Sequence, residues 1–163
     1  MKKITIITIG TITVLLAITF PFLAFGAPAR EGGAVFSRDV QGKEWILLEF
    51  RIAGKNVRMD RQKLEADFTG GVYTISFREG RVSGVGAPNR FFSAYTTGSN
   101  RALGIERIAS TLMAPFREPD DLKERDYFNY LSRVTRWDFK EGKLELCGSN
   151  DSGAELVLVF IPK

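Results

Sequence analysis

Residues 80–115 constrain the fold most, because they break into short strand-like runs that are separated by turn-forming residues. Glycines, Pro88 and Asn100 fall between the runs, at positions where a chain reverses direction. Within one run Phe91 and Tyr95 stand at alternating positions, which is typical of a strand with one buried face. The stretch therefore predicts three or four short antiparallel strands that lie side by side.

Strand patterns continue on both sides of this stretch. Leu48, Phe50 and Ile52 recur at every second position, so they are expected to share the buried face of a first strand. The run at residues 155–161 is almost entirely apolar, which indicates a strand buried on both faces in the middle of the sheet. Strands outside the central stretch are thus expected at residues 44–52, 72–77, 144–147 and 155–161.

One hairpin pattern occurs twice. Residues 77–82 read FREGRV, and residues 139–144 read FKEGKL. Glycine adopts the positive φ that a tight hairpin requires, so Gly80 and Gly142 predict two hairpins of the same kind.

A helix is predicted over residues 116–133. Pro119 suits a first helical turn, and the acidic residues after it suit the positive end of a helix. Apolar residues then share one broad arc that is expected to pack on the sheet: Tyr127, Phe128, Tyr130, Leu131 and Val134. Two structures are possible for residues 55–69. Leu64 and Phe68, four residues apart, are compatible with a helical turn, and a hairpin is equally compatible with the sequence.

These elements predict one α+β, β-rich domain over residues 44–163. Its architecture is expected to be an antiparallel curved sheet or partial barrel with one main helix packed against it. Residues 27–43 show little periodicity and contain glycine, alanine and proline, so they are expected to form a flexible N-terminal arm.

Residues 1–26 have the pattern of a signal peptide. Lys2 and Lys3 precede a long apolar run, and Ala24-Phe25-Gly26 supplies the small residues that a signal peptidase needs. Cleavage after Gly26 predicts a periplasmic or secreted protein. The alternative is an uncleaved N-terminal membrane anchor, because the run is long enough to span a bilayer.

Two absences exclude whole classes of chemistry. The chain has no histidine, which removes His-dependent catalysis and His-ligated metal sites, and Cys147 is its only cysteine, which removes intramolecular disulfides. Without Lys2 and Lys3 the formal charge falls from +4 to +2, too balanced for a nucleic-acid-binding face. Cys147 is expected to be covered by the helix or the N-terminal arm, with dimerisation through the thiol as the alternative.

Four local patterns are candidates for chemistry, and each has a structural interpretation that we favour. Residues 150–153 have fewer carboxylates than a calcium loop and favour a turn, and the glycines of residues 80–86 precede no helix, unlike a dinucleotide loop. Residues 90–92 favour core aromatics over a basic-aromatic nucleic-acid platform. Helix capping is favoured over acid–base chemistry for the acidic cluster: Glu118, Asp120, Asp121 and Glu124.

Five short sequence motifs follow one another in a recognisable order. They are NRFFSAY at residues 89–95, IASTLMA at 108–114, FNYL at 128–131 in the predicted helix, WDF at 137–139 and LEL at 144–146. In this order they resemble the META domain, the family that includes the heat-shock protein HslJ, over residues 44–160.

The sequence departs from the family pattern at two prolines. Relatives often carry a cysteine just before the asparagine and another after the M-A dipeptide, where this chain has Pro88 and Pro115. If those cysteines pair in relatives, both halves of the disulfide are replaced here together. The motif residues are expected to be structural, with Met113 buried between sheet and helix: Asn89, Phe91, Tyr95, Thr111, Met113 and Ala114.

The resemblance implies a small exported domain without enzymatic chemistry and without a cofactor or metal. We therefore expect it to act in the envelope or a stress response through a binding surface, with an envelope protein or a small ligand as partner. No nucleic acid is expected, and a membrane only through an uncleaved N-terminal segment. The alternatives are a barrel-like carrier of a small apolar ligand and an enzyme that uses Asp, Glu, Ser or Thr alone.

Overall fold

The computed structural model describes residues 31–67, 71–114 and 119–163, with side chains from residue 35 onward. Its helices are α1 (Glu31–Asp39), α2 (Arg61–Asp67), α3 (Glu124–Ser132) and the short 3-10 helix η1 (Ser99–Arg101). Its strands are β1 (Glu44–Ile52), β2 (Lys55–Arg58), β3 (Thr74–Arg78), β4 (Arg81–Val85), β5 (Arg90–Thr97), β6 (Leu103–Ile105), β7 (Ala109–Ser110), β8 (Val134–Lys140), β9 (Lys143–Ser149) and β10 (Glu155–Pro162).

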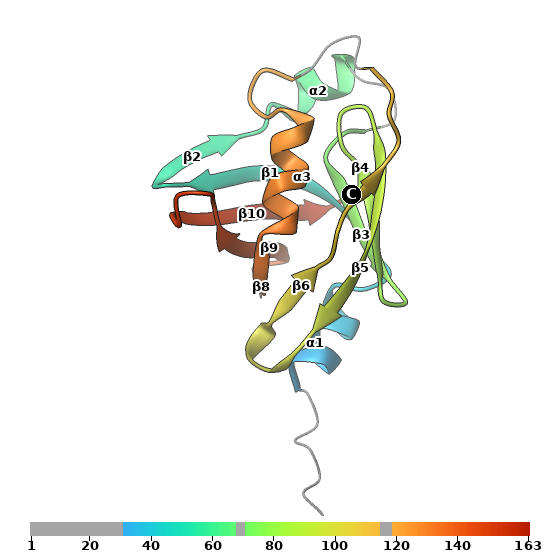
Figure 1. The fold of residues 1–163 in the computed structure, drawn as a ribbon, viewed down its shortest axis with the longest axis vertical. Helices are drawn as coiled ribbons and strands as arrows, with labels where there is room; N and C mark the ends of the chain where they lie inside the picture. The colour runs from blue at the N-terminus through green and yellow to red at the C-terminus, as the bar shows by residue number, and fades with distance from the viewer. Residues whose placement is uncertain (1–30, 68–70, 115–118) are drawn as a thin grey trace, which may run out of the picture.

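The strands form one antiparallel sheet that is nearly closed into a barrel (Figure 1). Its order is β6-β5-β4-β3-β1-β10-β9-β8, with β2 added to β1 and β7 added to β5. The two ends of this order meet, because Ala102, next to β6, bridges Arg136 in β8. This confirms the predicted fold class, a β-rich α+β domain with a curved sheet and a packed helix.

The two Glu-Gly hairpins form as the sequence predicts. Glu79 and Gly80 join β3 to β4 with φ angles of +47° and +74°. Glu141 and Gly142 join β8 to β9 with φ angles of +52° and +74°. Two successive residues with positive φ make the type I′ turn whose twist matches that of paired strands.

A β-bulge in β1 changes which side chains of the first strand face the core. The pairing of β1 with β10 shifts between Leu47 and Glu49. Trp45 and Leu47 are therefore buried before the shift and Phe50 after it, while Leu48 is only half-buried. The prediction that Leu48 shares the buried face and Leu47 the opposite one is wrong, because an extra residue reverses the alternation.

Residues 55–67 form both structures that the sequence left open. β2 pairs with β1 as a hairpin, and α2 follows with Leu64 as its buried residue. Phe68, the other residue assigned to a helical turn, lies outside the described residues.

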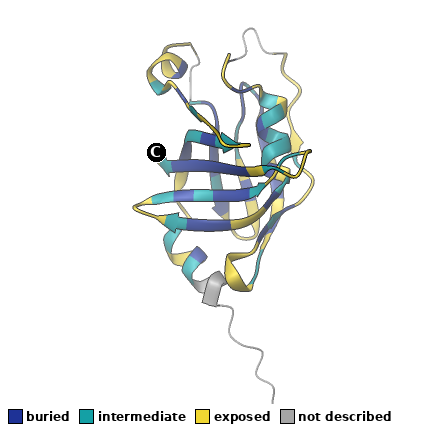
Figure 2. Cartoon of the chain, turned by 90° about the vertical axis from the view of Figure 1, so that its left-hand side faces the viewer, coloured by how far each residue is buried: buried dark blue, intermediate teal, exposed yellow. Residues whose placement is uncertain are grey.

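The core is filled by large side chains from opposite walls of the barrel. Trp45, Trp137, Phe77 and Phe160 are all fully buried. β10 lies between β1 and β9, and its residues 156–160 are all buried, which confirms the prediction of a central strand buried on both faces (Figure 2).

Helix α3 is shorter than predicted. It begins at Glu124 and ends at Ser132, with Tyr127 and Leu131 buried as expected. Residues 119–123 are not helical, and residues 115–118 lie outside the described part of the chain. A helix through Leu122 would turn that side chain away from the buried arc. Outside the helix Leu122 is 3% exposed, and its carbonyl accepts a hydrogen bond from the Tyr73 hydroxyl.

The expected flexible arm is wrong from Glu31 onward, because α1 packs against one end of the barrel (Figure 1). Phe36 and Val40, one helical turn apart, are both buried. The Phe36 ring lies 5.1 Å from that of Phe77 and 5.0 Å from that of Trp137. Residues 1–26, the predicted signal segment, are outside the description, and none of the described helices is long and apolar enough to cross a membrane.

Candidate functional site

A groove lies on the outer face of strands β3, β4 and β5. Ile75, Phe77 and Val82 point into the core, so the alternate residues of β3 and β4 point outward. The register places Ser76 opposite Ser83, and Ser83 opposite Phe92 in β5. Small side chains in the middle of this row leave a hollow, because the side chains around them are longer.

Three arginines surround the hollow. Arg78 in β3 pairs directly with Arg81 in β4. This pair lies two residues along the strands from the pair formed by Ser76 and Ser83, on the same face of the sheet. Arg90 lies at the start of β5 and pairs with Val85, on the other side of the serines. We call the hollow the arginine groove; its volume is about 520 Å³, and its outward-facing residues include Ser76, Arg78, Arg81, Ser83, Arg90 and Phe92.

The three guanidinium groups carry a local positive charge that the described residues do not neutralise. No described carboxylate forms an ion pair with Arg78, Arg81 or Arg90. Arg78 donates a hydrogen bond to the Gly42 carbonyl at 3.2 Å. Like charges on directly opposite strand positions repel, so the Arg78–Arg81 pair is unfavourable without an anion nearby.

Phe92 forms an apolar side of the arginine groove. It is 51% exposed, and the Arg81 guanidinium lies 5.5 Å from the centre of its ring. The interpretation of residues 90–92 as core aromatics is therefore correct for Phe91, which is 2% exposed, and wrong for Phe92. At the far end of the groove Glu44 is neutralised by Lys163, whose Nζ lies 2.8 Å from the carboxylate.

A second polar cluster, the Asn89 clamp, joins the first motif phrase to the second and to α3. It consists of Asn89, Thr111, Glu124 and the backbone of Met113. The Asn89 amide donates to the Met113 carbonyl at 3.1 Å and to Glu124 Oε2 at 2.7 Å. Its oxygen accepts from the Thr111 hydroxyl at 2.8 Å and from the Met113 N–H at 2.7 Å. All four hydrogen-bonding positions of this buried amide are filled.

Glu124 completes the clamp from the first turn of α3. Its Oε1 accepts hydrogen bonds from the backbone N–H groups of Ala87 and Asn89, both at 2.6 Å. A Cβ at Gly86 would lie 2.6 Å from the same oxygen, so this approach requires glycine. The carboxylate thus ties α3 to the segment that contains Ala87 and Asn89.

The side chain of Met113 lies at the surface. Its side chain is 52% exposed and that of Leu112 is 96% exposed, so the prediction of a Met113 buried between sheet and helix is wrong. The clamp binds the backbone of Met113, which leaves the side chain to point outward. Ala114 is also exposed.

The remaining motif residues, Phe91 and Tyr95, lie in the core on the inner face of β5. The Phe91 ring lies 6.0 Å from that of Tyr127 and 5.3 Å from that of Phe128, so it joins β5 to α3. The Tyr95 ring lies 5.7 Å from that of Phe36, and its hydroxyl accepts a hydrogen bond from Gln41, which ties β5 to the α1 end of the barrel.

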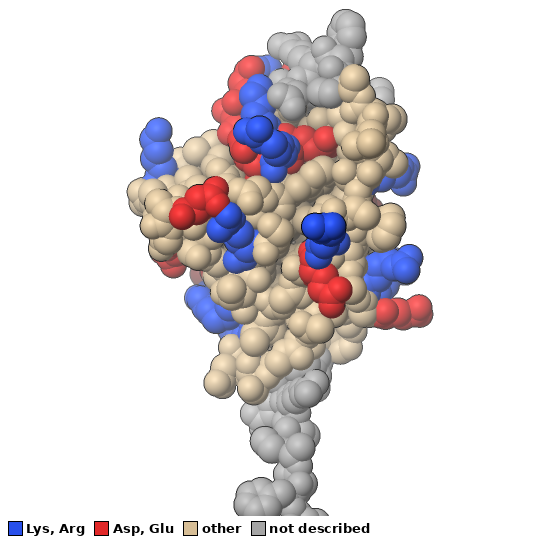
Figure 3. All heavy atoms as spheres, viewed as in Figure 1, with Lys and Arg blue, Asp and Glu red and all other residues tan. Residues whose placement is uncertain are grey.

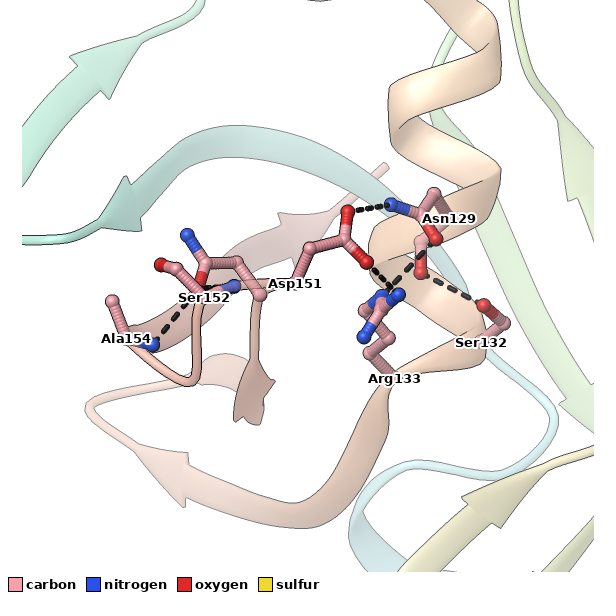
Figure 4. A network of polar contacts seen from close by, with 7 residues as sticks. Asn129, Ser132, Arg133, Asp151, Ser152 and Ala154 are labelled. Atoms are coloured by element: carbon pink, nitrogen blue, oxygen red, sulfur yellow. Dashed lines mark hydrogen bonds and ion pairs between the residues drawn. The ribbon is translucent and has the colours of Figure 1, made fainter.

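Residues 150–153 form a turn, as the sequence favours. The Asn150 side-chain oxygen accepts from the backbone N–H groups of Ser152 at 3.1 Å and Ala154 at 2.8 Å. Asp151 pairs with Arg133 and Asn129 at the end of α3 (Figure 4). The turn therefore fastens the β9–β10 connection to the helix.

The acidic cluster is dispersed. Glu118 lies outside the described residues, Asp120 pairs with Lys63 at 3.1 Å, and Glu124 belongs to the Asn89 clamp. Neither Asp120 nor Asp121 caps α3, because the helix begins at Glu124. Across the described ranges no group of three or more Asp, Glu or Cys residues is placed to hold a metal ion.

Cys147 is buried in a small cluster that is separate from the main core. It is 8% exposed and packs with Val157 and Val159 on the opposite face of the sheet from Leu146. The buried residues of α1 and α3 belong to the core on the other face, so the predicted cover by the main helix is wrong, and residues 27–30 of the arm lie outside the described part of the chain. Burial raises the pKa of the Cys147 thiol.

Charged residues elsewhere are interspersed. On the face that carries α3, Lys and Arg lie among Asp and Glu with no field of one sign (Figure 3). Arg51 pairs with Glu145, and Arg133 with Asp151.

Arg78 and Arg81 were not predicted from the sequence as residues of a site. The available signal was their alternation with Phe77 and Val82, which face the core.

The fold is that of a small α+β protein with a nearly closed antiparallel barrel. The META domain family model matches residues 38–160, so the chain belongs to the META domain family. The match begins within α1, which agrees with the packing of this helix on the barrel.

Two solved structures share the fold. An NMR structure of a protein from Burkholderia xenovorans is 20% identical, covering 79% of this chain and 87% of that one, with a TM-score of 0.59. A crystal structure of a duf4847 family protein from Bacteroides vulgatus is 11% identical, covering 77% and 95%, with a TM-score of 0.50. No curated protein matches the chain.

Proposed function

We propose that the protein is an exported, non-enzymatic META domain that acts in the cell envelope through a binding surface on the outer face of β3, β4 and β5. The observation that carries this proposal is the directly opposed pair Arg78 and Arg81, which has no carboxylate partner among the described residues. Such a pair lowers stability unless an anion offsets the repulsion, so its presence favours a ligand.

The absence of catalysis is part of the proposal. The sequence has no histidine, and the best-organised carboxylate, Glu124, already accepts three hydrogen bonds within the Asn89 clamp. A carboxylate held in this way stabilises the fold and has little freedom to move a proton.

The carrier alternative receives less support from the packing. Trp45, Trp137 and Phe77 occupy the interior of the barrel and are completely buried, whereas the arginine groove opens on its outside. A ligand on the outer face fits this arrangement better than one enclosed by the strands.

Export and a role in stress belong to the same proposal. The N-terminal pattern of Lys2, Lys3 and Ala24-Phe25-Gly26 favours a cleaved signal peptide. Protein isolated from the native cell should then begin at Ala27 and be recovered from the periplasm or the medium. Intact protein that begins at Met1 and remains in the membrane would contradict cleavage.

The binding surface is tested by comparing which components of an envelope extract bind to the wild type and to its variants. Protein isolated from the native cell is immobilised and exposed to envelope extract. The proteins and small molecules that it retains are then identified by mass spectrometry. The double variant Arg81→Glu with Arg90→Glu should lose the specific component, because it replaces two positive charges of the groove by negative ones. The control Arg125→Glu, on a 94% exposed side chain of α3, should keep it. Retention that survives the double variant would refute this binding surface.

A further inference from the structure

We infer that the arginine groove binds a small phosphate monoester that carries a planar apolar ring. The phosphate would lie among Arg78, Arg81 and Arg90, and the ring against Phe92. This inference deepens the proposed binding function and rests on it, because it names the chemistry of the ligand.

The positions of the charged groups favour an anion with several acceptor oxygens. Arg81 and Ser83 are alternate residues of β4 on one face, about 7 Å apart along the strand. Arg78 pairs with Arg81, and Arg90 pairs with Val85, so the arginines approach Ser83 from both sides. Guanidinium groups bind phosphate through paired N–H donors.

A hydroxyl donor is available among them. Ser83 is exposed, and no hydrogen bond joins its hydroxyl to any other part of the described chain. The Ser76 hydroxyl, by contrast, donates to the Lys43 carbonyl at 3.0 Å. Ser83 is therefore the hydroxyl that can donate to an anion held by the three arginines.

The charge balance favours phosphate over carboxylate. Three arginines contribute a charge of +3, while Glu44 at the far end is already paired with Lys163. A phosphate monoester carries about −1.5 to −2 at neutral pH and three acceptor oxygens, whereas a carboxylate carries −1. The phosphate therefore offsets more of the repulsion between Arg78 and Arg81.

Phe92 supplies the second half of the recognition. It is the cross-strand partner of Ser83, so the Cβ atoms of the two residues lie about 5 Å apart. Its exposed face and the adjacent Arg81 guanidinium offer a stacking surface to a planar ring. The volume of about 520 Å³ lies within the range of small-molecule sites, which favours a compact ligand over a polymer.

Isothermal titration with phenyl phosphate tests the inference, with inorganic phosphate, phenol and benzoate as comparison ligands. Phenyl phosphate should bind at least about tenfold more tightly than any of the three, because only it engages both the arginines and Phe92. Affinity should fall as salt is raised, since the charges are exposed. Benzoate binding as tightly as phenyl phosphate would overturn the assignment of phosphate, and the absence of phenyl phosphate binding would overturn the inference.

Variants locate the two halves of the site. Arg81→Gln and Arg90→Gln should each weaken phenyl phosphate about tenfold or more, and Arg125→Gln should leave it unchanged. Phe92→Ser should weaken phenyl phosphate while inorganic phosphate binds as before. Equal losses in Arg125→Gln, or no loss in either groove variant, would overturn the inference.

The two proposals fail separately. If the double variant loses its envelope component but phenyl phosphate does not bind, the ligand class is wrong and the binding surface stands. If the envelope component is retained by the double variant, the binding surface itself is wrong.

Discussion

The Asn89 clamp and the arginine groove are both polar, and they differ in how far their polar groups satisfy one another. In the clamp, every donor and acceptor of the Asn89 amide has a partner. In the groove, three guanidinium groups share one face of the sheet with no described carboxylate to pair with them. The clamp, whose hydrogen bonds are all made, holds the fold together, whereas the guanidinium groups of the groove are available to a ligand.

The largest decrease in the free energy of unfolding is expected when the Asn89 clamp is removed. Asn89→Ala removes hydrogen bonds from four partner atoms: Thr111 Oγ1, the Met113 N–H and carbonyl, and Glu124 Oε2. At about 1 kcal/mol for each bond, the free energy of unfolding should fall by roughly 4 kcal/mol in urea denaturation. Asn56→Ala, at an exposed position of β2, is the control and should change it by less than about 0.5 kcal/mol. Similar free energies of unfolding for Asn89→Ala and Asn56→Ala would show that the clamp does not hold the fold together.

Truncation of Met59 and of Met113 tests whether the second motif supports the fold through its backbone or through its side chains. Met59 is 3% exposed and Met113 is 52% exposed. Met59→Ala should lower the free energy of unfolding by about 2–5 kcal/mol, because it leaves a cavity. Met113→Ala should lower it by less than about 1 kcal/mol, because the clamp holds only the Met113 backbone. An equally large loss for Met113→Ala would show that its side chain supports the fold.

Cys147 tests the outer face of the sheet away from the groove. Because the thiol is buried and its pKa is raised, it carries less thiolate at pH 8 than an exposed thiol does. Its reaction with a thiol reagent should be at least about tenfold slower in the native protein than in denaturant, with a rate profile displaced to higher pH. Native labelling as fast as in denaturant would show that this face is open.

The smallest stability effect is expected in the groove. Arg78→Gln should change the free energy of unfolding by less than about 0.5 kcal/mol, or raise it slightly, because it removes a like-charge pair. Added salt should stabilise the wild type more than the variant, since salt screens the repulsion that only the wild type retains. A loss of 2 kcal/mol or more, on the order of a lost core contact, would give Arg78 a structural role.

Local patterns predicted most of the elements. The alternation of Phe91 and Tyr95 located β5, the apolar run at residues 155–161 located β10, and the two Glu-Gly pairs located the hairpins, because these signals depend only on neighbours in sequence. The bulge at Leu48 reverses the inward face of β1 without any local sign that the period had changed.

Features that depend on distant partners were not predictable in the same way. Just before α3, Leu122 is buried and its carbonyl accepts a hydrogen bond from the hydroxyl of Tyr73, which lies 49 residues earlier. Glycines in α1 weakened its helical signal, whereas Phe36 and Val40 stabilise it by packing on the barrel. The arginine groove exists only in the register that pairs Arg78 with Arg81 and Ser83 with Phe92.

A chemical-shift map of isotope-labelled protein titrated with phenyl phosphate shows whether a ligand binds in the arginine groove. If the ligand lies in the arginine groove, the largest amide shifts should fall at Ser83, Arg81 and Phe92, and the amides of Asn89 and Glu124 should move little. Largest shifts at the clamp, or shifts spread over the surface without a maximum in β3, β4 and β5, would contradict binding in the arginine groove.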